Sequence, residues 1–574
     1  MNTSSAPRQL ILLCDGTNNN LTGGHADTNV VKLCELLKAA SPDGRRLLHY
    51  DPGVGHAGGL PGATGWDRLK RRMERLAGLA FGGGVYENMA ESYLFLMRHY
   101  QPGDQIFIFG FSRGAFTARS IAGLVNQFGV LQSHMESMLP TLLHVYFADR
   151  GDRRRWDEIS AQAARLFTDE REREVDIEFV GVWDTVASVG MWPFGAKFSA
   201  LPKPEGKGFI HVRQALALDE HRLQFMPRLY ARDNGPFMSR SGREGSLVQL
   251  WFPGAHCDVG GGYTPPDAAL SDAALAWLTS EAVLCGLRLD DGAGRALDSE
   301  ALLMRRLSEI AEPVLPTGRR LLAHSELCRT PWWALSGMSV RDTTRVVMDN
   351  GDQMVLQPQA HKPEPACVVD NCWSGARSPV LFWYCLGLLP LVVLALGQLL
   401  YGAPDTGSLP GDLRESWDKV LAYLGSNADF QRWQLSFWQF GQGAQSFASP
   451  RWALFWDLGL IACYAIPFSW LAARAFAQRV GRRHAGDGDR PGLNKLGLAL
   501  PLAVFADLGE NLCGLLCITA SVNEVELLAG LLHLLMALCS LLKWLGLAGL
   551  LLLVSGMGLP ALRPEPMAAA QPRR

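Results

Sequence analysis

The stretch that decides the fold is PGDQIFIFGFSRGAFTAR at 102–119. Its first part, QIFIFG, is a short continuous apolar run, which is typical of a buried strand. Its last part is rich in alanine and predicts a helix. Between them, GFSRG at 110–114 has the spacing GxSxG, in which Gly110 and Gly114 permit a tight strand-to-helix turn that projects the hydroxyl of Ser112.

Further along the N-terminal part, short apolar or β-branched runs alternate with helical patterns. This alternation predicts an α/β fold, a mostly parallel sheet with helices on both faces. The predicted strands besides 105–110 are QLILLC at 9–14, IEFVGV at 177–182 and SLVQLWF at 246–252, and a helix is expected over 85–99. Ser112, Asp184 and His256 each follow the end of such a strand, the edge at which open α/β sheets build their sites.

These three residues suggest nucleophilic catalysis. A serine hydroxyl is a poor nucleophile unless a base takes its proton, and the base needs a carboxylate to orient it. In α/β-hydrolases the chain order is serine, acid, histidine, and Ser112, Asp184 and His256 follow that order. Taken singly, Asp184 is equally well explained as a turn or helix-cap residue, and His256 as a loop histidine. Together they predict a triad of nucleophile, acid and base.

Six ordered motifs connect the chain to a known family. They are CDGTNNN near the start, YDPGVG at 50–55, the segment at 102–119, GVWDTV at 181–186, ALALDEHR at 215–222 and HCDVGGGY at 256–263. In this order they resemble the bacterial DUF2235 family, which contains phospholipase effectors of type VI secretion. The resemblance covers about residues 8–340. It implies an α/β-hydrolase fold, hydrolysis of phospholipid esters, and catalytic roles for Ser112, Asp184 and His256.

The resemblance also implies an oxyanion site. The first donor would be the backbone N–H of Arg113, the residue after the nucleophile. The Asp-Gly-Thr turn of the family matches Asp15, Gly16 and Thr17, and a second donor is expected from Gly16 or Thr17. Supporting roles are expected for Asp15, Gly110, Gly114 and Asp258. One departure is Gln214, which stands where relatives often carry a histidine.

The C-terminal part has the composition of a membrane region. Of 110 charged residues, 27 lie in 378–574, so the charged fraction falls from about 22% to about 14% there. A spanning helix needs about 20 mostly apolar residues, and four segments meet this length: 379–401, 452–473, 496–520 and 527–557. The expected domains are a catalytic domain at 1–340, a linker at 341–377, an all-α transmembrane region of about four helices at 378–557 and a tail at 558–574.

The basic residues of this region predict its orientation. The connection 474–495 and the C-terminal tail are rich in arginine, and such loops stay in the cytoplasm. An even number of spans then places the N-terminal domain in the cytoplasm too. We expect a multi-pass protein of the bacterial inner membrane.

Three charged residues lie near the middle of the last two predicted spans. Asp507 and Glu510 are spaced i, i+3 and share one helix face, and Lys543 lies near the middle of the following span. Charges at this depth are costly, so they should face the bundle interior and pair. A structural clamp is favoured, and a polar path for a pore, a transporter or a lipid-access groove is the alternative.

Composition excludes some functions and leaves others open. With 54 Lys+Arg against 56 Asp+Glu, nothing suggests a nucleic-acid partner. The 12 cysteines form no CxxC pair, no cluster has metal-ligand spacing, and no cofactor is expected. The predicted function is a membrane-anchored serine phospholipase acting on bilayer lipids. The alternative is a non-catalytic channel or signalling protein with a lipid-sensing domain, and any immunity or secretion partner stays open.

Overall fold

The computed structural model describes residues 7–16, 27–38, 45–53, 83–147, 158, 175–186, 206–230, 237–252, 254–263, 269–289, 324–341, 450–482, 490–522 and 526–555. The chain divides into two compact units: Met1–His324 with Arg341–Lys362, and Ser325–Val340 with Pro363–Arg574. This division differs from the predicted boundary after residue 340. Leu327 and Met338 pack in the core of the C-terminal helices, whereas Arg341 is bonded to Asp184 in the first unit.

The first unit is built on a parallel sheet, which confirms the predicted fold class. Its strands, in the order β2-β1-β3-β4-β5-β6 across the sheet, are β1 (Gln9–Cys14), β2 (Arg46–Asp51), β3 (Gln105–Phe111), β4 (Ile177–Trp183), β5 (Phe209–Ala217) and β6 (Ser246–Phe252). Every neighbouring pair is parallel. The register pairs Cys14 with Gly110 and Trp183 with Ala215, so the carboxyl ends of the central strands lie level with one another.

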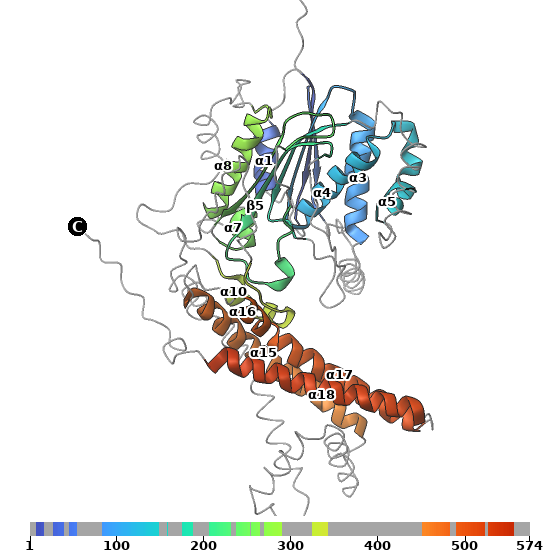
Figure 1. Ribbon diagram of the computed structural model, residues 1–574, viewed down its shortest axis with the longest axis vertical. Coiled ribbons are helices and arrows are strands. Elements are labelled where there is room, and N and C mark those ends of the chain that lie inside the picture. Colours follow the sequence, from blue (N-terminus) through green and yellow to red (C-terminus); the bar gives the residue numbers. More distant parts are fainter. Residues whose placement is uncertain are drawn as a thin grey trace, which may run out of the picture. The chain divides into compact units, whose positions relative to one another are not determined.

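Helices cover both faces of this sheet (Figure 1). One face carries α3 (Gly83–His99), α4 (Ser112–Phe128) and α5 (Leu139–Phe147), and the other carries α1 (Asn29–Lys38) and α8 (Ala269–Leu284). The two cores arise because successive strand side chains point to opposite faces. Leu10 and Leu12 pack in the first core, and Ile11 and Leu13 pack in the second.

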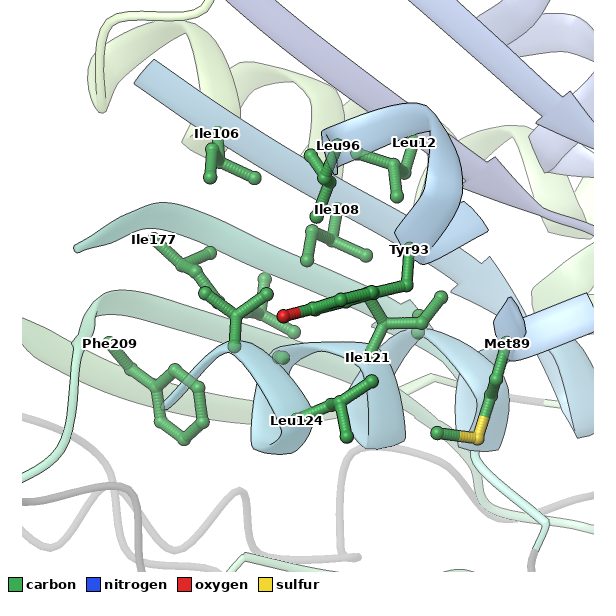
Figure 2. Packing of buried hydrophobic residues seen from close by; sticks show 14 of the residues in the cluster. Leu12, Met89, Tyr93, Leu96, Ile106, Ile108, Ile121, Leu124, Ile177 and Phe209 are labelled. Carbon is green, nitrogen blue, oxygen red and sulfur yellow. The ribbon is translucent and has the colours of Figure 1, made fainter. Parts of the chain in front are cut away.

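Figure 2 shows the core beneath α3 and α4. Tyr93 of α3 lies among Ile108, Ile121 and Leu124, all fully buried. Its hydroxyl donates to the carbonyl oxygen of Gly129 at 2.8 Å, so the polar atom in this apolar core is satisfied. This packing fixes α4, which begins at Ser112, against the sheet.

The second unit is helical. It contains α10 (Glu326–Arg329), the 3-10 helix η4 (Pro331–Ser336), α15 (Pro450–Arg482), α16 (Arg490–Leu496), α17 (Ala499–Val522) and α18 (Glu526–Ser555). α17 and α18 lie side by side (Figure 1). Leu327 and Met338 from the short helical segment pack with Ile461, Phe476 and Leu500 in one core.

Two of the four predicted membrane spans coincide with candidate spanning helices of the structure. In the described residues, Gly492–Leu516 and Leu534–Ser555 are long and apolar enough to cross a membrane, and they coincide with the third and fourth predicted spans. The second, 452–473, lies within α15 and is not one of these two candidates. The first, 379–401, lies outside the described residues.

Lys543 of α18 lies between two carboxylates of α17. Its Nζ is 3.1 Å from Asp507 Oδ1 and 2.6 Å from Glu510 Oε2. The hydroxyl of Tyr464 in α15 donates to Asp507 Oδ2 at 2.5 Å. The side chains of Lys543, Asp507 and Glu510 are only 14%, 9% and 7% exposed, respectively. This is the geometry of a clamp that ties α15, α17 and α18 together.

We expect Lys543→Met to destabilise the helical unit by about 3 kcal/mol, because two buried carboxylates would lose their cation. Adding Asp507→Asn should restore part of this loss, since only one buried charge then remains unpaired. The measurement is the denaturant midpoint of the detergent-purified wild type and of the single and double variants. Unchanged midpoints in both variants would reject the clamp and favour a polar path.

Candidate active site

Ser112 lies at the junction of β3 and α4 in a strained conformation. Phe111 before it is extended, with φ −124° and ψ 140°. Ser112 itself has a φ of +58°, in the left-handed region that residues other than glycine rarely adopt. This is the sharp turn that the GxSxG spacing predicts, and it sets the serine at the carboxyl edge of the sheet.

The two glycines of the turn allow its close packing. A Cβ on Gly110 would lie 2.5 Å from the carbonyl oxygen of Gly114. A Cβ on Gly114 would overlap the carbonyl oxygens of Cys14 and Asp15, at the end of the neighbouring strand β1. The turn therefore packs directly on the backbone of β1, and these positions accept no side chain without a shift of the sheet edge.

Asp184 follows β4 and is fully buried. Its φ is +40°. In the described part of the chain, Ser112 and Asp184 are the two non-glycine residues with a positive φ. Its backbone N–H donates to Ala215 O at 2.7 Å, and its Oδ1 accepts from the N–H of Ala217 at 3.0 Å. The end of β5 thus fixes both the backbone and the carboxylate of Asp184.

His256 begins the short helix α7 (His256–Gly260) and is buried. Its Nδ1 lies 2.6 Å from Asp184 Oδ2. The imidazole packs against the rings of Phe111, at 4.6 Å between centroids, and Phe225, at 5.0 Å. Its Nε2 has no hydrogen-bond partner among the described residues. The structure therefore joins Asp184 to His256 and packs the imidazole on Phe111, the residue before Ser112.

No hydrogen bond joins Ser112 to His256 in the described structure. Such bonds are often long in ligand-free enzymes and tighten only when substrate binds. The free Nε2 is the atom of His256 that would accept a serine proton.

In the Asp-Gly-Thr turn, the backbone N–H of Gly16 is not available for its predicted role as an oxyanion donor. The backbone N–H of Gly16 donates to Asp15 Oδ1 at 2.6 Å, so it is not free for a ligand. The other carboxylate oxygen of Asp15 accepts from the hydroxyls of Thr28 and Tyr50, at 2.8 and 2.9 Å. Asp15 is thus a buried support for the end of β1, and Thr17 lies outside the described residues.

Arg113 follows the serine in the first turn of α4. Burial lowers the pKa of its guanidinium to about 10. Among the described residues, no acidic side chain forms an ion pair with that guanidinium.

Asp258, the predicted supporting acid, belongs to a second Asp–His pair. Its Oδ1 lies 2.6 Å from His324 Nδ1, and its Oδ2 accepts from the backbone N–H groups of Ala255 and His324 at 2.8 and 2.9 Å. It thereby holds the start of α7, the helix whose first residue is His256.

Arg341 is the site residue that sequence reasoning missed. Its Nη1 lies 2.5 Å from Asp184 Oδ1 and its Nη2 lies 2.9 Å from Asp184 Oδ2, with both side chains 0% exposed. Burial alone would raise the pKa of Asp184, but the charge of Arg341 and the hydrogen bond with His256 hold this pKa well below its usual range. A lone arginine 157 residues beyond its partner carries no local signal in the sequence.

Glu220 is a further acid beside His256. Its Oε2 accepts from the backbone N–H of His256 at 3.3 Å, and Arg222 binds both of its carboxylate oxygens. Burial would raise the pKa of Glu220, but Arg222 lowers it to about 2. Both residues lie in the motif ALALDEHR, whose presence was the available signal.

Gln214, the departure from relatives, is fully buried and bonded through both its amide oxygen and its amide nitrogen. Its Oε1 accepts from Arg119 at 3.0 Å and from Thr185 at 3.2 Å, and its Nε2 donates to Arg228 O at 3.0 Å. It therefore neutralises no charge, and it ties β5 to α4. Within the described ranges, no group of three or more His, Cys, Asp or Glu residues could hold a metal ion.

The first unit is thus an α/β protein with Ser112 on a strained strand-to-helix turn after β3 and an Asp–His pair that follows the ends of β4 and β6. Residues 8–281 match the family described as T6SS, phospholipase effector Tle1-like, catalytic domain. This match agrees with the family that the six motifs predict.

Two further proteins are similar to this chain. An uncharacterized protein of Saccharomyces cerevisiae is 31% identical over 235 residues, which is 39% of this chain and 32% of that protein. The chain therefore aligns with about a third of the length of this relative. A crystal structure of an uncharacterized protein from Pseudomonas aeruginosa matches at 17% identity with a TM-score of 0.28, over 57% of this chain and 58% of that one. A score this low does not establish a common fold.

Proposed function

We propose that the first unit is a serine hydrolase that cleaves carboxylic ester bonds of phospholipids. The match of residues 8–281 to a phospholipase family model supports the substrate class. The observation that carries the mechanism is the imidazole of His256. Its Nδ1 is bonded to the buried Asp184, and its Nε2 is left without a partner in the described part of the chain, next to the turn of Ser112.

In this mechanism, Ser112 Oγ attacks the acyl carbonyl carbon while His256 Nε2 takes the hydroxyl proton and then passes it to the leaving alcohol. Asp184 keeps the imidazole in the required tautomer and stabilises its cation. Water then hydrolyses the acyl-enzyme. The N–H of Arg113 would stabilise the oxyanion, and each such donor contributes about 3 kcal/mol. The N–H of Gly16 is bonded to Asp15, so of the two donors expected from this turn, Thr17 stays the prediction.

We also propose that the second unit holds the enzyme at a lipid bilayer. Only 28% of the apolar stretch in α18 is buried. The remaining surface of this helix exposes large apolar side chains: Leu527, Leu528, Leu531, Leu534, Leu535, Leu538, Leu541, Trp544, Leu545, Leu551 and Leu552. A continuous apolar surface of this kind favours a lipid or protein partner over water. The charge pattern of the sequence favours a bacterial inner membrane, with the first unit in the cytoplasm.

The test is fatty-acid release from mixed phospholipid vesicles by the detergent-purified wild type and by Ser112→Ala. We expect the variant to lose activity by about 10^4-fold or more, because the nucleophile is removed. Ser120→Ala, on the same helix α4, is the matched control and should keep wild-type activity. Circular dichroism of all three proteins checks that the fold is intact.

Release by the wild type and Ser120→Ala alone would establish a serine phospholipase, and the products would name the bond. Equal release by wild type and Ser112→Ala would reject the nucleophile. No release by any of them would favour the alternative, a channel or signalling protein whose first unit binds lipid without turning it over.

A further inference from the structure

Arg341 is completely buried, and within the described structure its guanidinium bonds to Asp184 and to the backbone carbonyls of Ala217 and Phe225. Nη1 binds Asp184 Oδ1 at 2.5 Å and the carbonyl oxygen of Ala217 at 2.6 Å. Nη2 binds Asp184 Oδ2 at 2.9 Å and donates to the carbonyl oxygen of Phe225. The guanidinium therefore binds both oxygens of Asp184 in a bidentate arrangement, which fixes the plane of the carboxylate.

This bidentate contact determines the orientation of the Asp184 carboxylate. A carboxylate has about four acceptor positions, and here they are filled by the two nitrogens of Arg341, the N–H of Ala217 and Nδ1 of His256. Rotation of the carboxylate would break several of these bonds at once. The Asp184 backbone is also strained, with its φ of +40°, and strain of this kind persists only where the surroundings hold it.

Arg341 also holds Phe225, whose ring packs against the imidazole of His256. The carbonyl of Phe225 accepts from its Nη2, and the ring of Phe225 packs edge-on against His256, at 72° between the ring planes. One guanidinium thus holds both the acid and an aromatic neighbour of the histidine.

Arg341 is the cation that compensates the charge of Asp184 beside His256. Asp184 and Glu220 supply two negative charges, and Arg222 neutralises Glu220 through bonds of 2.6 and 2.8 Å. Asp258 on the same helix as His256 is bonded to His324. Without Arg341, the carboxylate of Asp184 would face the imidazole as an uncompensated charge.

We propose that Arg341 is a positioning residue for ester hydrolysis: it orients Asp184, and through Asp184 it holds His256 ready to take the proton of Ser112. This inference rests on the proposed serine-hydrolase function. Arg341 lies beyond the residues that match the family, 8–281, and follows directly on Ser325–Val340, a segment of the second unit. The site therefore takes an essential part from outside the segment that carries its motifs.

The test compares Arg341→Met and Arg341→Lys with the wild type, using dihexanoyl phosphatidylcholine below its micelle concentration as substrate. We expect Arg341→Met to lower kcat about 100-fold with KM unchanged, since a misplaced catalytic group costs rate and not binding. The acid side of its pH–activity profile should move up by about one unit, because the unshielded carboxylate favours the protonated imidazole. Arg341→Lys should restore the pH profile but only part of kcat, since lysine lacks the planar fork.

Arg213→Met is the matched control. It breaks another buried arginine pair in the same sheet, with Glu281 at 2.6 Å, and should leave kcat and the pH profile unchanged. If Arg341→Met shows the wild-type profile and kcat, Arg341 is only structural and the proposal is overturned.

A double variant distinguishes an Arg341 that positions Asp184 from an Arg341 that acts directly on the substrate. In an Asp184→Asn background, Arg341→Met should lower kcat by less than about threefold, since residues that act as a unit are not additive. A full further loss of about 100-fold would mean that Arg341 acts on the substrate itself, which also overturns the proposal. If Arg341→Met does not fold, Arg341→Lys carries the test, because it keeps the buried charge and must still lose kcat at least tenfold. Failure of the hydrolase function itself would appear separately, as inactivity of the wild type.

Discussion

Asp184→Asn should lower kcat for phospholipid hydrolysis by about 10^4-fold, the size of effect expected when the acid of a Ser-His-Asp triad loses its charge. The amide can donate as well as accept, so it no longer selects the tautomer in which Nδ1 of His256 carries the proton. It also provides no negative charge for the imidazolium. Activity above a tenth of the wild type would reject Asp184 as the triad acid.

The same substitution should also reduce stability, because Arg341 would be left buried without its anion. Removing one partner of a buried pair costs about 3 kcal/mol. Since the pKa of Asp184 is held below its usual range in the folded state, its contribution is present above the unfolded pKa of about 4 and fades as the pH falls further. The stability difference between wild type and variant should therefore be full at pH 7 and shrink below about pH 4.

Glu178→Gln is the control for this experiment. Glu178 lies on the same strand β4, and Arg243 binds both of its carboxylate oxygens at 2.8 and 2.9 Å. This variant also breaks an arginine–carboxylate pair, but it is remote from the strand end. We expect its kcat to equal that of the wild type, so a comparable loss would assign the effect of Asp184→Asn to the sheet and not to the triad.

The elements that were predicted correctly are those whose signal is local. The run at 105–110 is apolar throughout and became the central strand β3, with Ser112 on its terminal turn. β2 and β5 were not predicted, because polar residues interrupt their apolar pattern. In β5, Arg213 and Gln214 are buried only because Glu281 and Arg119 pair with them across the fold. Such partners are distant in the sequence and leave no periodic trace.

In the candidate site, too, the residues with a local sequence signal were predicted, and those that depend on tertiary contacts were not. Asp184 and His256 follow predicted strands in the expected chain order, and the structure places them 2.6 Å apart. Arg341 joins them only through tertiary contact. The N–H of Gly16 was expected at an oxyanion site, but whether an N–H is free depends on the rotamer of Asp15, which no motif encodes. Likewise, the apolar segment 452–473 could be a span or a packed helix by length alone.

The packing at Gly114 leads to the second large effect, a loss of folding stability. Gly114→Ala places a Cβ against the carbonyl oxygens of Cys14 and Asp15. Neither oxygen can retreat easily, because Cys14 is paired with Gly110 on one side and with Asp51 on the other. We expect the free energy of unfolding of the first unit to fall by about 3 kcal/mol or more, since overpacking against fixed backbone forces the sheet edge to shift. The shift would also move Ser112 and reduce turnover in whatever protein still folds.

Gly123→Ala, in the same helix, separates this packing from helix propensity. There a Cβ would meet the hydroxyl of Tyr146, the far end of a side chain that can move. Alanine is favoured over glycine within a helix by up to about 1 kcal/mol, so Gly123→Ala should stay within about 1 kcal/mol of the wild type. Urea unfolding of both variants measures the contrast. Equal midpoints would mean that the turn has room for a side chain, and the close approach of α4 to β1, on which the geometry at Ser112 depends, would have to be abandoned.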